Sequence, residues 1–125
     1  VVLLIIYMTN DCFNNLTIVS HDNPQQLNNL FETEFIDKKI QIDYKGDQGI
    51  KLELWSPWTP DFKWLESLIT KYPECWIKNE WWEEGGNAGI WTGGAIYKGR
   101  SENIVRIEWT DICIEGIHQY FKPLN

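Results

Sequence analysis

The sequence predicts an α+β sandwich in which two helices cover one face of a mostly antiparallel sheet. Three observations lead to this fold class. Segments of alternating apolar and polar residues recur along the chain, amphipathic stretches separate them, and glycine-rich turns join the later ones. Seven of the eight tryptophans lie between Trp55 and Gly94, where strand, helix and turn signals follow one another closely.

The first half of the chain contains signals for three strands and one helix. The opening strand alternates and is rich in β-branched residues. Asn23 is a suitable N-cap and Pro24 a suitable first residue for the helix that follows. The predicted elements are strands over 13–20, 38–44 and 50–54 and a helix over 24–36.

The second half contains signals for a helix, three strands and a closing helix. Thr59 is the expected N-cap of the first of these helices, with Pro60 at its first position, and Pro73 ends it. The glycines between 85 and 89 predict a hairpin turn, and Gly93-Gly94 a β-bulge. The predicted elements are a helix over 60–72, strands over 76–84, 90–98 and 104–109, and a short C-terminal helix over 111–121.

Charge and cysteine content exclude several classes of function. The chain has a net charge of −7, with 11 Lys and Arg against 18 Asp and Glu, so binding to nucleic acid is not expected. Three cysteines lie far apart, which favours reduced thiols in a cytosol. The spacing of Cys113 from His118 and of Cys12 from His21 does not match a zinc motif, so we expect no metal and no cofactor.

The first seven residues, Val1 to Tyr7, are wholly apolar and read as an extension that precedes a domain over 8–125. They are too short to span a bilayer, so no membrane association is expected. In a strand, alternate side chains point to opposite faces, and some of the seven would meet solvent in a monomer. The extension therefore predicts a possible homodimer. The alternative is burial under the C-terminal helix.

Several motifs resemble a family of small phage and mobile-element proteins with a ferredoxin-like fold. Met8-Thr-Asn-Asp-Cys-Phe-Asn-Asn-Leu-Thr-Ile is similar to the family opening Met-Pro-Asn-Trp-Cys-x-Asn-x-Leu-x-Ile, with Thr9 in place of proline and Asp11 in place of tryptophan. Later landmarks are Trp55-Ser-Pro-Trp-x-Pro, Tyr72-Pro73, and Glu83-Glu84-Gly85 followed by Gly89. The resemblance implies a ferredoxin-like domain and the cytoplasm of a bacterial host. It implies no activity.

The best cluster of carboxylates lies at the end of the strand over 76–84. Alternation places Glu80, Trp82 and Glu84 on one face of this strand, and Trp81 and Glu83 on the other. One interpretation makes Glu80 and Glu84 an acid/base pair beside sugar-stacking tryptophans. The simpler interpretation is that Glu84 leads into the turn while the other carboxylates are solvated.

The leading hypothesis is a non-enzymatic protein-interaction protein that binds a host protein or a second copy of itself. Its motivation is an acidic chain with more tryptophan than a core of this size needs. The alternative is a carbohydrate- or small-ligand-binding module or a hydrolase, so the question of enzymatic activity stays open. A simpler interpretation is that the tryptophans pack in the core. The candidate interaction surface consists of Trp55, Trp58, Glu80, Trp82, Glu84 and Trp91.

Overall fold

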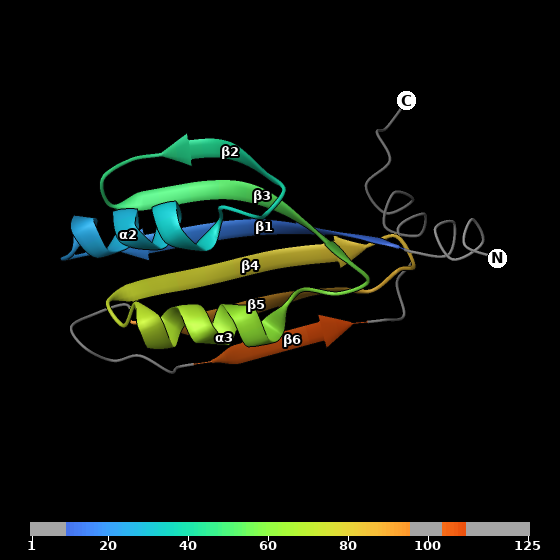
Figure 1. Cartoon of the computed structure of the whole chain (residues 1–125). Helices are drawn as coiled ribbons and strands as arrows, with labels where there is room; N and C mark the ends of the chain where they lie inside the picture. The colour runs from blue at the N-terminus through green and yellow to red at the C-terminus, as the bar shows by residue number, and fades with distance from the viewer. Residues whose placement is uncertain (1–9, 96–103, 110–125) are drawn as a thin grey trace, which may run out of the picture.

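The computed structural model describes residues 10–95 and 104–109 as an α+β fold with a six-stranded antiparallel sheet and two helices (Figure 1). The predicted extension, 1–7, and the predicted C-terminal helix, 111–121, lie outside the described residues. The elements, in chain order, are β1 (Asp11–Ser20), α2 (Pro24–Glu34), β2 (Ile40–Lys45), β3 (Gly49–Pro57), α3 (Phe62–Lys71), β4 (Cys75–Glu83), β5 (Ala88–Gly94) and β6 (Val105–Trp109).

The strand order in the sheet is β2-β3-β1-β4-β5-β6, and every neighbouring pair is antiparallel. β1 lies inside the sheet and pairs with β3 along one edge and with β4 along the other. Helix α2 connects β1 to β2, and helix α3 connects β3 to β4. In both cases one strand lies between the two strands that the helix connects, which is a split β-α-β arrangement used twice.

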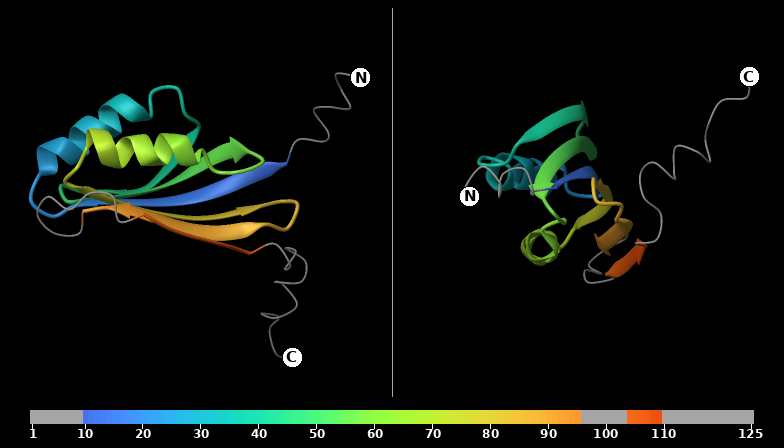
Figure 2. Two further views of the ribbon diagram at one scale, coloured as in Figure 1. Left: turned by 90° about the horizontal axis from the view of Figure 1, so that it is seen from below. Right: turned by 90° about the vertical axis from the view of Figure 1, so that its right-hand side faces the viewer.

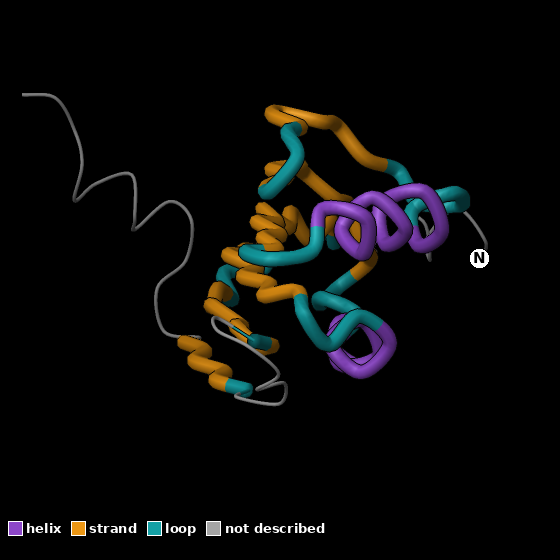
Figure 3. Tube along the Cα trace, turned by 90° about the vertical axis from the view of Figure 1, so that its left-hand side faces the viewer, coloured by secondary structure: helices purple, strands orange, loops and turns teal. Residues whose placement is uncertain are grey.

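Both helices cover the same face of the sheet, as the sequence predicts. Figure 2 shows α2 and α3 on one side of the strands, and the end-on view in Figure 3 shows helices and strands as two layers. Between the layers lies a core that is almost wholly aliphatic and closed by a few rings. Its fully buried large apolar members are Leu16, Ile18, Leu27, Leu30, Ile50, Leu52, Leu65, Leu68, Ile69, Ile77 and Trp91.

One helix begins where the sequence predicts, and the other begins two residues later. In α2 the side chain of Asn23 accepts a hydrogen bond from the backbone N–H of Gln26 at 2.9 Å. The N-cap of α3 is Asp61, whose carboxylate accepts from the Trp64 N–H at 3.1 Å. Thr59 is therefore not the cap. Its carbonyl accepts from the hydroxyl of Ser56, which keeps it in the preceding turn.

The predicted bulge at Gly93-Gly94 is absent. The β4–β5 ladder runs without a shift from Trp76 opposite Gly94 to Trp82 opposite Ala88. Gly94 is instead required by its left-handed φ of 101° and by the close approach of the Cys75 carbonyl oxygen, which leaves no room for a Cβ. The register shift lies in β2, between Ile42 and Tyr44.

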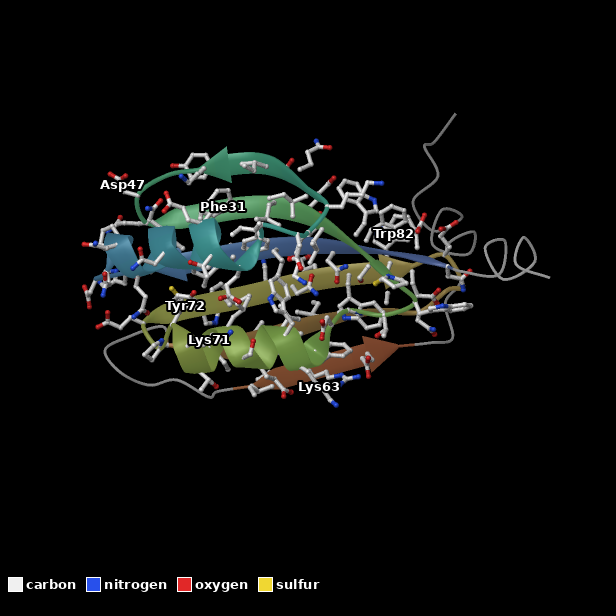
Figure 4. The ribbon with its side chains drawn as sticks, in the orientation of Figure 1. Phe31, Asp47, Lys63, Lys71, Tyr72 and Trp82 are labelled. Carbon is white, nitrogen blue, oxygen red and sulfur yellow. The ribbon has the colours of Figure 1, made fainter. Side chains whose placement is uncertain are left out.

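The two helices are linked to each other at the end of α3. The hydroxyl of Tyr72 donates to Glu34 Oε2 at 3.0 Å, and Lys71 Nζ lies 3.7 Å from Glu34 Oε1 (Figure 4). Burial and this hydrogen bond to a carboxylate raise the pKa of Tyr72 above its ordinary value. The contact holds α3 beside α2. Neither of these two helices lies on the opposite face of the sheet (Figure 2).

Candidate functional site

Three aromatic side chains form a row across the face of the sheet that neither α2 nor α3 covers; we call this the open face. Phe13 of β1 lies opposite Trp55 of β3 on one side and opposite Trp82 of β4 on the other. The Phe13 and Trp82 ring centroids are 4.4 Å apart with planes tilted by 31°, and the Phe13 and Trp55 centroids are 6.3 Å apart at 77°. We call Phe13, Trp55 and Trp82 the aromatic row. Trp82 remains 38% exposed.

A fourth aromatic residue, Trp58, lies at the same end of the sheet. It comes one residue after β3, and its backbone N–H donates to the carbonyl of Asn10, just before β1, at 2.8 Å. Its φ is 66°, which makes it the only non-glycine residue with positive φ in the described part of the chain. A tryptophan in this region is strained, and its side chain is 51% exposed. Backbone strain of this kind concentrates at functional sites.

Carboxylates border the aromatic row on both sides. Asp11 and Glu84 lie at the end of the sheet, where the Asp11 N–H donates to Glu84 Oε1 at 2.9 Å. Glu53 of β3 and Glu80 of β4 lie opposite Asn15, one step further along the same face. We call Asp11, Glu53, Glu80 and Glu84 the acidic rim. Glu80 also forms an ion pair with Lys78 at 2.9 Å.

The alternation predicted for β4 is confirmed. Glu80 and Trp82 are exposed on the open face, whereas Trp81 and Glu83 are buried on the covered face. Glu84 lies in the turn after β4, as the simpler interpretation expects. The structure therefore brings five of the six candidate residues to one end of the open face or its border.

Trp91 is the exception and corrects the predicted surface. It is 0% exposed and belongs to the core on the covered face, where it lies opposite Asn79. Gly89 and Gly93 flank it on the same face, and a Cβ at Gly93 would lie 2.8 Å from its ring. The ring needs the space that these glycines leave, so Trp91 is buried and cannot contact a partner.

Sequence reasoning missed the buried role of Glu83. Its carboxylate accepts from the Gly85 N–H at 2.6 Å and from the Asn87 N–H at 2.9 Å. These bonds close the β4–β5 turn and satisfy the side chain, which is only 2% exposed. The sequence signal for this role is the position of Glu83 directly before a glycine-rich turn, whose backbone N–H groups need an acceptor.

Two buried asparagines also escaped prediction. Asn79 Nδ2 donates to Asn14 Oδ1 at 2.9 Å, and Asn14 Nδ2 donates to the Leu54 carbonyl at 3.0 Å and to Ser56 Oγ at 2.9 Å. This network connects β4, β1 and β3 beneath the helices. It holds together the three strands that carry the aromatic row on their other face.

The rings of the aromatic row do not form the coplanar platform that stacking on a sugar requires. Phe13 packs against one side of Trp82 and meets Trp55 edge to face, so the rings contact one another more than they present parallel free faces. Glu80 and Glu84 are engaged by Lys78 and by the Asp11 N–H. The row therefore lacks the parallel free ring faces on which a sugar would stack.

Cys12 and Cys75 are free and buried, and Cys113 lies outside the described residues. Burial raises the pKa of Cys12 to about 11 and that of Cys75 to about 12, so neither is a nucleophile near neutral pH. Within residues 10–95 and 104–109, no group of three or more His, Cys, Asp or Glu side chains is arranged to hold a metal ion. Neither of the described helices has the length and apolar character needed to cross a bilayer.

Comparison of the chain with known protein families, with curated proteins and with solved structures gives no match.

Proposed function

We propose that the chain is a non-enzymatic protein-interaction protein that binds a partner through the aromatic row, Trp58 and the acidic rim. The observation that carries this proposal is the aromatic row on the face opposite α2 and α3, with Trp82 38% exposed among the residues that the structure describes. An uncovered face that keeps large aromatic side chains partly in water is typical of a surface that another molecule covers.

The energetics favour Trp58 and Trp82 as the anchors of such an interface. Tryptophan is enriched among the few residues that supply most of the binding free energy. Trp58 is 51% exposed and held in a strained backbone conformation, so its presentation to solvent costs folding stability. Binding that buries its ring would offset this cost.

The acidic rim favours a basic segment of another protein as the partner. Carboxylates on both sides of the row attract lysine and arginine, and an arginine guanidinium also stacks well on an exposed tryptophan. A second copy of this chain is less suitable at this surface, because each copy carries a net charge of −7. A host protein with a basic, partly apolar patch is the occupant to which the proposal commits.

The element order supports a ferredoxin-like assignment as part of the proposal. The series β1-α2-β2-β3-α3-β4 with β1 and β3 central matches the split β-α-β pattern, and β5 and β6 extend the sheet beyond β4. A phage or mobile-element origin and action in a bacterial cytoplasm rest on the resemblance of the Met8 and Trp55 motifs alone.

The test is capture of partners from a bacterial lysate with immobilised full-length chain and matched variants. We expect a protein retained by the native chain to be lost with Trp82→Ala and with Trp58→Ala. Tyr44→Ala is the control, because Tyr44 is also an exposed aromatic residue but lies on the edge strand β2. The purified partner is then titrated against each variant by calorimetry.

Equal retention by native chain, Trp82→Ala and Trp58→Ala would contradict the proposal. Retention that is lost only with Tyr44→Ala would place the interface at the other end of the sheet. Light scattering on the same variants checks self-association, and a dimer mass that Trp82→Ala abolishes would replace the host protein with a second copy.

A further inference from the structure

A cleft of about 950 Å³ lies on the other side of Trp55, at the end of the sheet where α3 begins. The loop before β2 forms one wall, the end of β3 forms the floor, and the first turn of α3 forms the second wall. Arg106 of β6 closes the cleft on its far side. Trp55 of the aromatic row also lines the cleft, whereas Phe13, Trp58 and Trp82 do not, so the cleft adjoins the surface proposed for the partner protein and shares one residue with it.

The cleft collects positive charge in an otherwise acidic chain. Lys38, Lys39, Lys63 and Arg106 line it, which is four of the eight Lys and Arg residues in the described part. Asp37, Asp61 and Glu66 also line the cleft, so its cations exceed its carboxylates by one, and the Asp61 carboxylate accepts the Trp64 N–H as the N-cap of α3.

Two of the three lysines that line the cleft lie over aromatic rings. Lys38 Nζ lies 4.4 Å from the ring centroid of Trp64, and Lys39 Nζ lies 5.6 Å from that of Trp55. Lys63 projects from the first turn of α3 near β6 (Figure 4). No carboxylate among the described residues forms an ion pair with any of these three lysines.

Arg106 is placed by two contacts that leave it at the mouth of the cleft. Its guanidinium lies 3.5 Å from the ring centroid of Phe62, and it donates to Glu108 at 3.0 Å. Phe62 in turn packs edge to face on buried Trp81, with centroids 6.1 Å apart. The cation is therefore supported by a ring that is itself anchored in the core.

We propose that this cleft binds a small, multiply charged organic anion, with organic phosphates as the leading class. Its volume lies in the range of about 300–1,000 Å³ that small-molecule sites occupy. The aromatic walls hold the ammonium groups over their faces and lower the local dielectric, which strengthens their attraction for a phosphate or carboxylate.

The size of the anion follows from the charge of the whole chain. A long polyanion would extend beyond the cleft and be repelled by the rest of the chain, whose net charge is −7. A small anion inside the cleft is governed by the nearby lysines, because charges further away than about 8 Å are largely screened at physiological ionic strength. A nucleotide-sized molecule meets both conditions.

The test is titration of the full chain with ATP, pyrophosphate, citrate and adenosine, followed by calorimetry and tryptophan fluorescence. We expect ATP to bind and adenosine not to bind, with weaker binding as KCl rises. The combined variant Lys38→Ala, Lys39→Ala and Lys63→Ala should lose about tenfold or more in affinity. Lys45→Ala is the matched control, since Lys45 also lies over a ring, that of Phe31, but outside this cleft.

The outcomes separate this proposal from its rivals and from the proposed function. If ATP, pyrophosphate and citrate each bind, the site accepts anions in general. If ATP and pyrophosphate bind and citrate does not, the site is specific for phosphates. No binding by any anion, or equal binding of ATP and adenosine, would overturn it. Lys63→Ala alone should already weaken binding if the combined variant does not fold. Trp82→Ala should leave anion binding unchanged even where it abolishes capture of a partner.

Discussion

The two faces of the sheet are built from alternate residues of the same strands, yet they differ in every respect that matters for function. The covered face carries aliphatic side chains, a buried asparagine network and Trp91 at 0% exposure. The open face carries the aromatic row, lysines and carboxylates, with Trp82 at 38% exposure. Adjacent residues such as Trp81 and Trp82 therefore have unrelated roles.

The contrast shows that tryptophan content alone does not identify a binding surface in this chain. Some rings, such as Trp91, stabilise the fold because α3 and neighbouring glycines enclose them. Others, such as Trp58 and Trp82, remain partly in water, away from the two described helices. The position of a ring relative to the two helices decides between these roles.

The largest expected effect on stability comes from replacing a tryptophan on the covered face, compared with the same replacement on the open face. Trp91→Ala leaves a large cavity between β5 and α3 and should lower the free energy of unfolding by about 3–5 kcal/mol. Trp82→Ala removes a half-exposed ring and its stack on Phe13, at a cost of about 1–2 kcal/mol. Urea denaturation monitored by circular dichroism measures both. Equal destabilisation by the two variants would remove the distinction between the faces.

Asn14 and Asn15 are neighbours on opposite faces of the sheet, and replacing each one tests whether polar residues also differ in role between the faces. Asn14→Ala leaves the buried Asn79 amide and the Leu54 carbonyl without their partner and should cost about 2 kcal/mol. Asn15→Ala, on the open face next to it, should change stability by no more than about 0.5 kcal/mol. The same urea titration compares them, and a neutral Asn14→Ala would show that the network is dispensable.

The buried thiols predict how the covered face responds to alkaline pH. The pKa values of Cys12 and Cys75 are raised from 9.0 to about 11 and about 12, so the folded state favours the protonated thiols. Their contribution to stability is fully present below about pH 9 and declines as pH rises towards these values, by about 1 kcal/mol per thiol and pH unit.

Iodoacetamide labelling followed by peptide mass spectrometry tests this at each thiol. Neither Cys12 nor Cys75 should be labelled at pH 8 in the native chain, and both should be labelled in urea. The double variant Cys12→Ala, Cys75→Ala should lose the part of the alkaline destabilisation that belongs to the thiols. Rapid native labelling at pH 8 would contradict their burial.

The smallest expected effect concerns the strained turn at the open end. Trp58→Gly relieves the cost of a positive φ, whereas Trp58→Ala keeps it, so the glycine variant should be more stable than the alanine variant by about 1 kcal/mol. Both variants lose the exposed ring and should bind the partner equally poorly. Thermal unfolding compares them, and identical melting temperatures would show that the turn stores no strain.

Local patterns predicted most of the fold. Alternation predicted the strands β1 and β4, because period-two alternation is a local property of a half-buried strand. It also predicted that Glu80 and Trp82 lie on one face of β4 and that Trp81 and Glu83 lie on the other. Helix α2 was recognisable from its Asn23-Pro24 start. The start of α3 was misplaced because Thr59 and Asp61 are both good caps and only the turn at Ser56 decides between them.

The site was predicted less well than the fold, since it depends on contacts between distant segments. The aromatic row exists because β3 and β4 both pair with β1 in the register that places Trp55 and Trp82 beside Phe13. This register cannot be predicted from a local sequence pattern, because it depends on how distant strands pair. Trp91 was misassigned because Gly89 and Gly93 stand on its face of β5 in place of the large apolar residues that mark a buried face, although the Gly-x-Trp-x-Gly spacing is itself a sign of an enclosed ring.

The central position of β1 has a consequence for how the chain is made in the cell. Its partner on one side, β3, follows soon after it, but its partner on the other side, β4, begins only at Cys75. At about 5–20 residues per second, the stretch of about 55 residues from Ser20 to Cys75 takes about 3–10 s to be translated. During that time the nascent chain carries a strand edge open to pairing with other chains. We therefore expect slower translation of this stretch to prolong the exposure of the edge of β1 that β4 later covers.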